Sequence, residues 1–316
     1  MMPARFLSRL LSLQVLLVGF LAGAAMAQSD VPRFEESACP FANDGIADIV
    51  RCGYLVVAEN RAVDNGRRLR LAVAVIRSSS ASPRSDPIVF LSGGPGGASV
   101  EFVPRRVDHF FWNRYRTDRD LVFFDQRGTG FSEPRFCPEL NVALYTAVFR
   151  GMGVEELRNF EREAVRECRA KMLDEGIDFS AYNSATSARD LDELRQALGY
   201  DSWNLFGVSY GTRLALTAMR DTPRGIRSVV LDSVISPNAP GADSNRKLMR
   251  TLRLVFDQCA ADERCQAAFP TLEADFFSVV DGLEARPVEL AMSDPDRFPD
   301  GRIVIDGTVF VAGVFQ

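Results

Sequence analysis

The stretch that decides the fold is Asp201–Asp221, with the sequence DSWNLFGVSYGTRLALTAMRD. Its apolar run Trp203–Phe206 is typical of a buried strand, and the small and apolar residues that follow the glycines are typical of a helix. Between them lies Gly-Val-Ser-Tyr-Gly, with Ser209 at the apex. Because glycine tolerates strained backbone, Gly207 and Gly211 permit a sharp turn that exposes the serine hydroxyl. We expect a nucleophile here; a glycine-rich turn with a capping serine is the alternative.

The bulk composition indicates a globular protein. The chain has 316 residues, of which 47% are hydrophobic and 25% charged, enough to bury a large core. The formal charge is −5 and the sequence has no dense basic run, so we do not expect nucleic acid as a partner.

Residues 1–27 have the features of a secretory signal. Arg5 and Arg9 precede the apolar stretch Leu10–Leu21, and Ala25-Met26-Ala27 forms a small-x-small cleavage site. We therefore expect an exported protein, periplasmic or extracellular, whose mature chain starts at Gln28 and does not insert stably into the membrane. A membrane anchor is the alternative, although the apolar run is short for a span.

Export makes the six cysteines candidates for disulfides. Fifteen pairings are possible, and we favour the pairs that are closest in sequence: Cys39–Cys52, Cys137–Cys168 and Cys259–Cys265. A metal site is not expected, because no cysteine pair has tight ligand spacing and the only histidine is His109.

Strand-like and helix-like stretches alternate along the chain. An irregular segment is expected up to about Ile49, and Asp64-Asn65-Gly66 predicts a hairpin between the first two strands. A helix capped by Thr186 or Ser187 should precede the serine corner. The other expected strands and helix are Gly53–Ala58, Leu69–Ile76, Pro87–Leu91, Arg119–Asp125, Ser228–Leu231 and the helix Glu155–Leu173. This alternation predicts an α/β fold with a mostly parallel sheet, an antiparallel N-terminal edge, and ligands at the carboxyl ends of the strands.

The pattern changes at about Pro237, after which helices are expected without intervening sheet strands. These are Asn245–Cys259, Ala261–Phe269 and Leu272–Leu283. We expect a signal peptide at 1–27, the N-terminal part of a core at 28–236 and an incomplete helical cap at 237–316. The apolar run at 302–316 ends without a turn signal, which suggests truncation.

Four motifs occur in a characteristic order: SGGPGG at 92–97, DQRGTGFS at 125–132, GVSYGT at 207–212 and VVLDSV at 229–234. With them, the chain resembles secreted α/β-hydrolases of the prolyl iminopeptidase and tripeptidyl aminopeptidase group, over about residues 50–316. The resemblance implies an α/β-hydrolase fold with a cap, a peptide or small acyl substrate, no cofactor, and removal of short units from peptide N-termini.

The resemblance also implies roles for individual residues. Ser209 would form an acyl-enzyme, and the backbone N–H groups of Tyr210 and Gly94 would bind the oxyanion, since Pro95 has no N–H. Asp125 and Arg127 would support the structure, with substrate contact as the alternative. The cap residues Asp243, Glu273 and Asp275 could hold a substrate α-amino group, although solvation of a helix surface is the simpler explanation for them.

The chain departs from the family in one respect: no histidine follows Ser209. His109 precedes the corner and is expected to be a lid or packed surface residue, and Asp232 to be a turn residue. We expect the triad acid and histidine to lie beyond Gln316. Two alternatives stay open: a small-molecule esterase or amidase, and a truncated product without catalysis.

Overall fold

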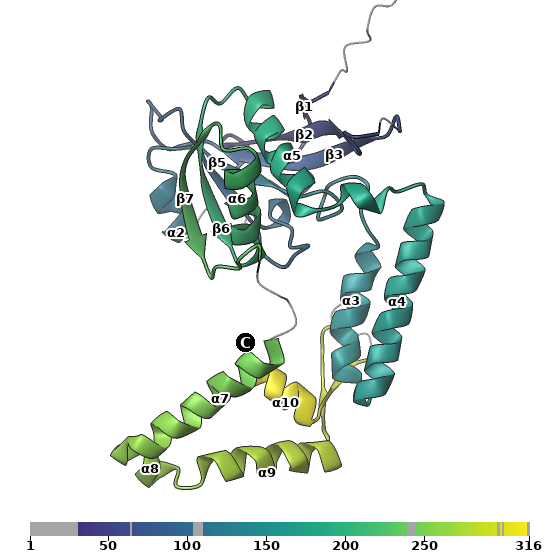
Figure 1. Cartoon of the computed structure of the whole chain (residues 1–316), viewed down its shortest axis with the longest axis vertical. Coiled ribbons are helices and arrows are strands. Elements are labelled where there is room, and N and C mark those ends of the chain that lie inside the picture. The colour runs from purple at the N-terminus through teal and green to yellow at the C-terminus, as the bar shows by residue number, and fades with distance from the viewer. Residues whose placement is uncertain are drawn as a thin grey trace, which may run out of the picture.

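The computed structural model describes residues 31–63, 65–103, 110–238, 244–295, 298 and 300–314. Figure 1 shows a twisted sheet with flanking helices at one end of the molecule and a lobe built mostly of helices at the other. No helix in the described ranges combines the length and apolar character needed to cross a bilayer. The signal segment at 1–27 and the hairpin residue Asp64 lie outside these ranges.

A seven-stranded sheet forms the first part of the molecule, in the order β1-β2-β3-β5-β4-β6-β7. Strands β1, β2, β3 and β5 are joined by antiparallel pairings, whereas β5, β4, β6 and β7 pair in parallel. The mostly parallel sheet with an antiparallel N-terminal edge is therefore confirmed. The strands are β1 (Arg33–Glu36), β2 (Val50–Ala58), β3 (Arg68–Ile76), β4 (Ile88–Leu91), β5 (Leu121–Phe124), β6 (Trp203–Val208) and β7 (Ile226–Asp232).

Strand β1 corrects the expectation of an irregular segment before Ile49. Its Arg33 pairs with Val56 of β2, so the sheet gains an edge strand. The short run has no regular alternation of apolar and polar residues, which is why its sequence gave no strand signal. The expected hairpin is present, since β2 and β3 pair along their length up to Ala58 opposite Arg68.

Helices cover both faces of the sheet (Figure 1). On one face, α5 (Ser184–Ala197) and α6 (Tyr210–Asp221) bury Leu191, Leu194 and Leu214 against the strands. On the other, Trp112 of α2 (Phe110–Tyr115) packs edge-on against Phe90 of β4, with ring centroids 5.1 Å apart. Short 3-10 turns occur at η1 (Val100–Phe102), η2 (Val148–Arg150) and η3 (Phe179–Ala181).

The N-cap of α5 corrects a second expectation. The helix begins at Ser184, and Asn183 caps it by accepting the Thr186 N–H at 3.0 Å. Thr186 and Ser187 were expected to cap but lie inside the first turn. Several residues near this point can cap, and Asn183 is the one with the extended backbone of an N-cap, φ −149° and ψ 167°.

The second lobe contains the helices α3 (Pro138–Ala147), α4 (Val154–Asp174), α7 (Ser244–Ala261), α8 (Glu263–Ala268), α9 (Leu272–Ala285) and α10 (Gly307–Val314). Its late segment also holds a strand pair, β8 (Val288–Ala291) and β9 (Arg302–Ile305), so the expectation of helices alone is incomplete. The segment packs on η2: the rings of Phe149 and Phe298 lie 6.1 Å apart, and Arg150 pairs with Asp300 at 3.2 Å. The boundary at 236/237 stays a prediction.

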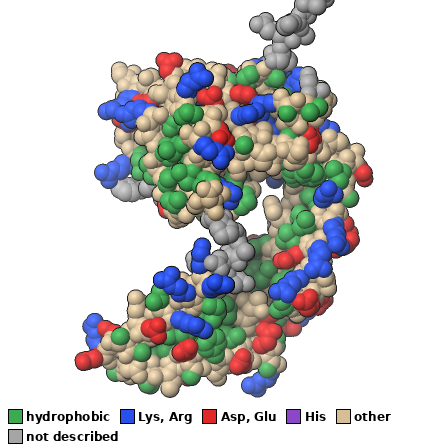
Figure 2. Space-filling view, viewed as in Figure 1, with side chains coloured by type: hydrophobic (Ala, Val, Ile, Leu, Met, Phe, Trp, Pro, Cys, Tyr) green, Lys and Arg blue, Asp and Glu red, His purple; other side chains and the backbone are tan. Residues whose placement is uncertain are grey.

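Three disulfides link the pairs Cys39–Cys52, Cys137–Cys168 and Cys259–Cys265. The first ties the segment after β1 to β2, the second joins the start of α3 to α4, and the third joins α7 to α8. Apolar side chains of the helical lobe, among them Leu254, Val255 and Phe269, are exposed. Figure 2 shows hydrophobic and charged side chains interspersed on this lobe.

Candidate active site

Ser209 stands alone between the end of β6 and the start of α6. Its backbone has φ 54° and ψ −121°, in the region that favours glycine, and it is one of three described non-glycine residues with positive φ. Such a conformation costs about 1–3 kcal/mol and persists only where the surroundings impose it. The side chain is half-buried rather than sealed in the core. The strained corner with an accessible serine, expected from the sequence, is therefore present.

Two glycines make this corner sterically possible. A Cβ on Gly207 would lie 2.6 Å from the carbonyl oxygen of Gly211, and a Cβ on Gly211 would lie 1.9 Å from the carbonyl oxygen of Leu91. Both distances are far below van der Waals contact. The glycines thus let α6 start directly over the end of β4.

Backbone hydrogen bonds fix the serine in place. The Ser209 N–H donates to the carbonyl oxygen of Asp232 at 2.9 Å, and the Ser209 carbonyl accepts from the Thr212 hydroxyl at 2.7 Å. The same hydroxyl accepts the N–H of Ile235 at 2.8 Å. The corner is therefore tied to the end of β7. The Asp232 carboxylate accepts only from the neighbouring Ser233 hydroxyl among the contacts described, as suits a turn residue.

The glycine loop after β4 passes against the serine. A Cβ on Gly93 would lie 2.9 Å from Ser209 Cβ and 3.5 Å from Ser209 Oγ. Gly94 follows with φ 112°, and Gly97 N–H donates to the Gly93 carbonyl at 3.1 Å. Sequence reasoning selected Gly94 and overlooked Gly93, although both belong to the same glycine run. The contact between Gly93 and Ser209 requires β4 and β6 to be neighbours in the sheet, and the glycine run does not reveal the order of the strands.

Asp125 joins this loop to the turn after β5. Its carboxylate accepts N–H groups from Ser99 at 2.6 Å, Val100 at 3.0 Å and Phe131 at 2.9 Å. Burial raises the pKa of Asp125, and these three backbone N–H groups oppose that shift. The carboxylate thus ties the loop after β4 to the turn after β5.

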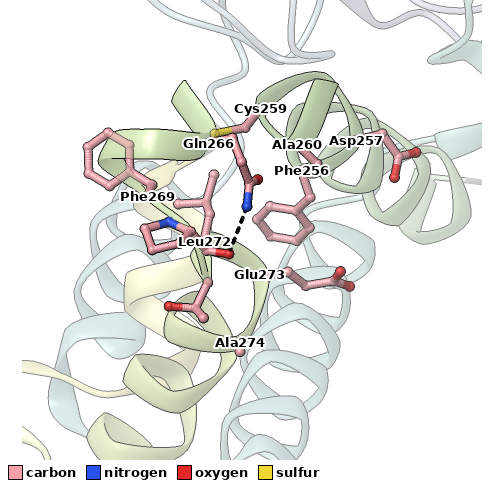
Figure 3. Close-up of a pocket in the computed structure, with 11 residues that line it drawn as sticks. Phe256, Asp257, Cys259, Ala260, Gln266, Phe269, Leu272, Glu273 and Ala274 are labelled. Atoms are coloured by element: carbon pink, nitrogen blue, oxygen red, sulfur yellow. Dashed lines mark hydrogen bonds between the residues drawn. The ribbon is translucent and has the colours of Figure 1, made fainter. Parts of the chain in front are cut away.

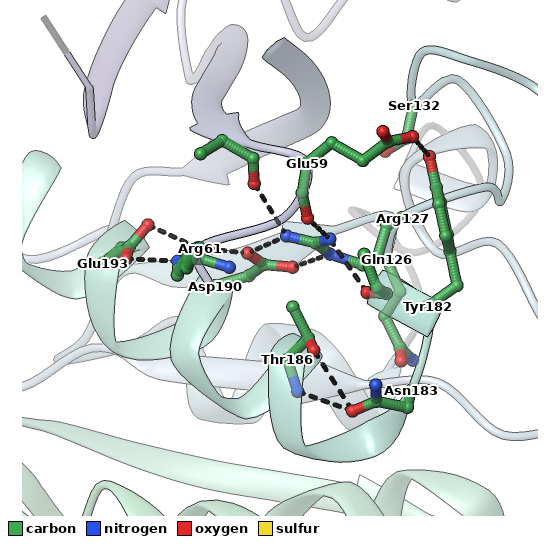
Figure 4. Close-up of polar contacts among 12 residues, drawn as sticks. Glu59, Arg61, Gln126, Arg127, Ser132, Tyr182, Asn183, Thr186, Asp190 and Glu193 are labelled. Atoms are coloured by element: carbon green, nitrogen blue, oxygen red, sulfur yellow. Dashed lines mark hydrogen bonds and ion pairs between the residues drawn. The ribbon is translucent and has the colours of Figure 1, made fainter. Parts of the chain in front are cut away.

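Arg127 lies two residues further on and is buried in a polar network (Figure 4). Its guanidinium binds the Asp190 carboxylate through two hydrogen bonds, at 2.6 and 2.8 Å. It also donates to the carbonyl oxygens of Glu59 at 2.7 Å and Ala181 at 3.0 Å. Arg61 reaches Asp190 from the other side at 2.6 Å. The network clamps α5 to the loop between β2 and β3, so this arginine supports the fold.

Ser209 does not line any of four pockets found in the described part of the chain. One of about 500 Å³ opens between α7, α8 and α9, with Phe256, Phe269 and Leu272 on its walls (Figure 3). Its rim carries Glu273, whereas Asp275 accepts from the Thr271 hydroxyl at 2.8 Å. The structure does not bring these acids to the serine.

Two further sequence candidates, His109 and Asp243, lie outside the described residues, and the structure places neither of them. No cluster of three or more potential metal ligands occurs in the part of the chain that the structure describes. The described site consists of Ser209, the amide of Tyr210 and the loop at 92–97.

A model of the alpha/beta hydrolase fold family matches residues 86–290, a stretch that contains the glycine loop, the serine corner and all the parallel strands. The chain belongs to this family.

Three curated relatives extend the comparison. Tripeptidyl aminopeptidase of Streptomyces lividans is 32% identical over 194 residues, which cover 60% of this chain and 36% of the relative. Serine protease Hip1 of Mycobacterium tuberculosis H37Rv is 30% identical over 252 residues, 73% of this chain and 46% of the relative. Carboxylesterase B of Mycobacterium tuberculosis CDC 1551 is 30% identical over 219 residues, which cover 67% of this chain and 41% of the relative. The matched stretch of the chain spans less than half the length of each relative.

Proposed function

We propose that this chain is part of an exported serine hydrolase that removes short units from peptide N-termini, with Ser209 as the nucleophile. The observation that carries the proposal is the strained, half-exposed serine held against the glycine loop. The two relatives named as a tripeptidyl aminopeptidase and a serine protease support a peptide substrate. The three disulfides support an oxidising compartment.

The proposed chemistry is acyl transfer. Ser209 Oγ attacks the substrate carbonyl, the amine leaves, and water then releases the acyl group from the serine. The amide of Tyr210, the first residue of α6, is one proposed oxyanion donor, and an amide of the loop at 93–94 is the other. Removal of one such donor typically costs about 3–4 kcal/mol of transition-state stabilisation.

The proton on Ser209 needs a base, and the described residues contain no histidine. Asp232 meets the corner through its backbone carbonyl, not through its carboxylate, so we assign it no base role. The location of the triad acid and histidine beyond Gln316 stays a prediction. So does the removal of residues 1–27 before Gln28.

The test is labelling by a fluorophosphonate, which reacts only with activated serines. The protein expressed from its complete reading frame should be labelled at Ser209, and the Ser209→Ala variant should not. No label on the wild-type protein, with a folded far-UV spectrum, would overturn the nucleophile assignment.

A second candidate function, hydrolysis of small esters, is favoured by the match to carboxylesterase B. Three substrates separate the two: a tripeptide p-nitroanilide with a free α-amino group, its N-acetylated form, and p-nitrophenyl butyrate. An aminopeptidase should cleave the free peptide and lose most activity on the acetylated one. Cleavage of the ester alone would favour the esterase.

A further inference from the structure

The first turns of α5 and α6 are joined by one hydroxyl–hydroxyl hydrogen bond. Ser184 Oγ and Tyr210 Oη lie 2.8 Å apart, and both side chains are half-buried. Ser184 is the first residue of α5, and Tyr210 is the first residue of α6, directly after the strained serine. The bond therefore joins α5, which contributes no residue to the Gly-Val-Ser-Tyr-Gly turn, to the residue directly after Ser209.

Tyr210 needs an anchor because α6 starts without a side-chain cap. Ser209 occupies the N-cap position but makes no capping hydrogen bond there, so its hydroxyl is not committed to the helix. Thr212 holds the Ser209 carbonyl through its hydroxyl and its N–H, and so fixes one end of the peptide plane that also carries the Tyr210 N–H. The side chain of Tyr210 is attached at the other end of that plane. The ring of Tyr210 packs on the core, and its hydroxyl is held by Ser184.

The start of α5, which carries Ser184, is held by the hydrogen bonds of Asn183. Asn183 accepts the Thr186 N–H at 3.0 Å (Figure 4). Its side-chain amide also donates to the Ser180 carbonyl at 2.8 Å. Six residues further along α5, Asp190 is held by Arg127 in the buried network. The start of α5 is thus anchored to the turn after β5, and Ser184 passes this constraint to Tyr210.

We infer that Ser184 is a positioning residue: through the Tyr210 hydroxyl it keeps the Tyr210 N–H aimed at the space in front of Ser209. The inference rests on the proposed function, in which that N–H binds the oxyanion. Ser184 touches no reacting atom. Its loss should therefore weaken stabilisation of the transition state and leave binding of the ground-state substrate unchanged.

The experiment uses the protein from its complete reading frame and the free tripeptide p-nitroanilide. Ser184→Ala and Tyr210→Phe each remove the same bond, so kcat should fall about 5- to 10-fold in either variant, the usual net effect of one hydrogen bond, with KM unchanged. The double variant should be no slower than the single ones. Ser184→Thr keeps the hydroxyl and should restore kcat. Arg189→Ala truncates an exposed side chain of the same helix and should behave as wild type.

Independent effects of the two substitutions, a change confined to KM, or equal losses in Ser184→Ala and Arg189→Ala would each overturn the inference. Thermal unfolding of all variants shows whether a loss of kcat merely follows loss of folded protein, which would also overturn it. Failure of the proposed function has another signature, because wild-type protein would then escape fluorophosphonate labelling. If wild-type protein is labelled and active but kcat of the Ser184→Ala variant is unchanged, only the positioning role of Ser184 is wrong and the proposed function stands.

Discussion

Gly93 and Ser209, 116 positions apart in the sequence, meet so closely that a Cβ on the glycine would lie 2.9 Å from the serine Cβ. The contact arises because β4 and β6 are neighbours in the sheet, with Leu91 opposite Gly207. Each strand delivers its following loop to the same edge. The serine and the glycine loop therefore form one site.

Gly93→Ala should displace the glycine loop from Ser209 or shift the serine itself. Since the loop supplies a proposed oxyanion donor, we expect fluorophosphonate labelling at least about 10-fold slower than wild type. The rate constant for labelling of folded protein is the measurement. An unchanged rate would show that the loop amides do not act on the serine.

Gly211→Ala tests the packing of α6 over β4. The added methyl group would lie 1.9 Å from the Leu91 carbonyl oxygen, and backbone cannot move aside cheaply. We expect a loss of about 3 kcal/mol or more in the free energy of unfolding, measured with urea. Gly282→Ala is the control, because nothing lies within 4 Å of its added Cβ and alanine favours the helix interior. Equal effects of the two would contradict the model of the corner.

Arg127→Ala should be far more harmful than a matched surface substitution. It removes two hydrogen bonds from the Asp190 carboxylate, whose side chain is 1% exposed, and the donor to the carbonyl oxygens of Glu59 and Ala181. Breaking a buried pair typically costs about 3–5 kcal/mol, and because Arg61 still pairs with Asp190 we expect a loss at the lower end of that range. Arg158→Ala removes an arginine from a pair with Glu155 in which both side chains are more than half exposed, and should cost less than about 1 kcal/mol. Urea unfolding of both variants checks this, and similar losses would argue against a buried clamp.

Acid should weaken the fold partly through Asp86. Burial alone raises the pKa of Asp86, but hydrogen bonds from Asn204 and Arg119, with the charge of Arg227, outweigh it and lower the pKa below 3.8. A carboxylate whose pKa is lower in the folded state contributes stability above the unfolded pKa of about 3.9, and loses it as the pH falls through that value toward the folded pKa.

Asp86→Asn removes this titration. Between pH 5 and pH 3, the urea midpoint of wild-type protein should therefore fall further than that of the variant, measured under identical salt. Parallel decreases in both proteins would mean that Asp86 ionises alike in the folded and unfolded states.

The Cys137–Cys168 disulfide should contribute more than the Cys259–Cys265 disulfide. The first closes a separation of 31 residues and the second one of 6. On the chain-entropy argument, a double Cys→Ala change at the long loop should cost about 1.5 kcal/mol more than at the short one. Thermal unfolding of the two double variants, each compared with wild type, measures the difference in stability. A larger loss at the short loop would show that native-state effects dominate.

The local elements could be predicted because their signals are local. The apolar run before Gly207 predicted a buried strand. Asn65-Gly66, with its flanking apolar runs, predicted the hairpin of β2 and β3. Strand β1 and the pair β8–β9 escaped prediction, because each of these four-residue runs contains at least one charged residue. The equally short β4 and β5 were predicted because they are wholly apolar. The N-cap was missed because Asn183 competes with other capping residues nearby.

The sequence by itself determined the corner at Ser209, since the flanking glycines, the buried strand and the helix are consecutive, and backbone preferences act over a few residues. Only the tertiary structure decided which distant residues meet: Gly93 beside the serine, Ser184 on the hydroxyl of Tyr210, and Arg127 on Asp190, 63 residues away. These partners follow from the strand order β5-β4-β6 and from the packing of α5 on α6. That order is set by the burial of whole strand and helix faces, which no short stretch encodes.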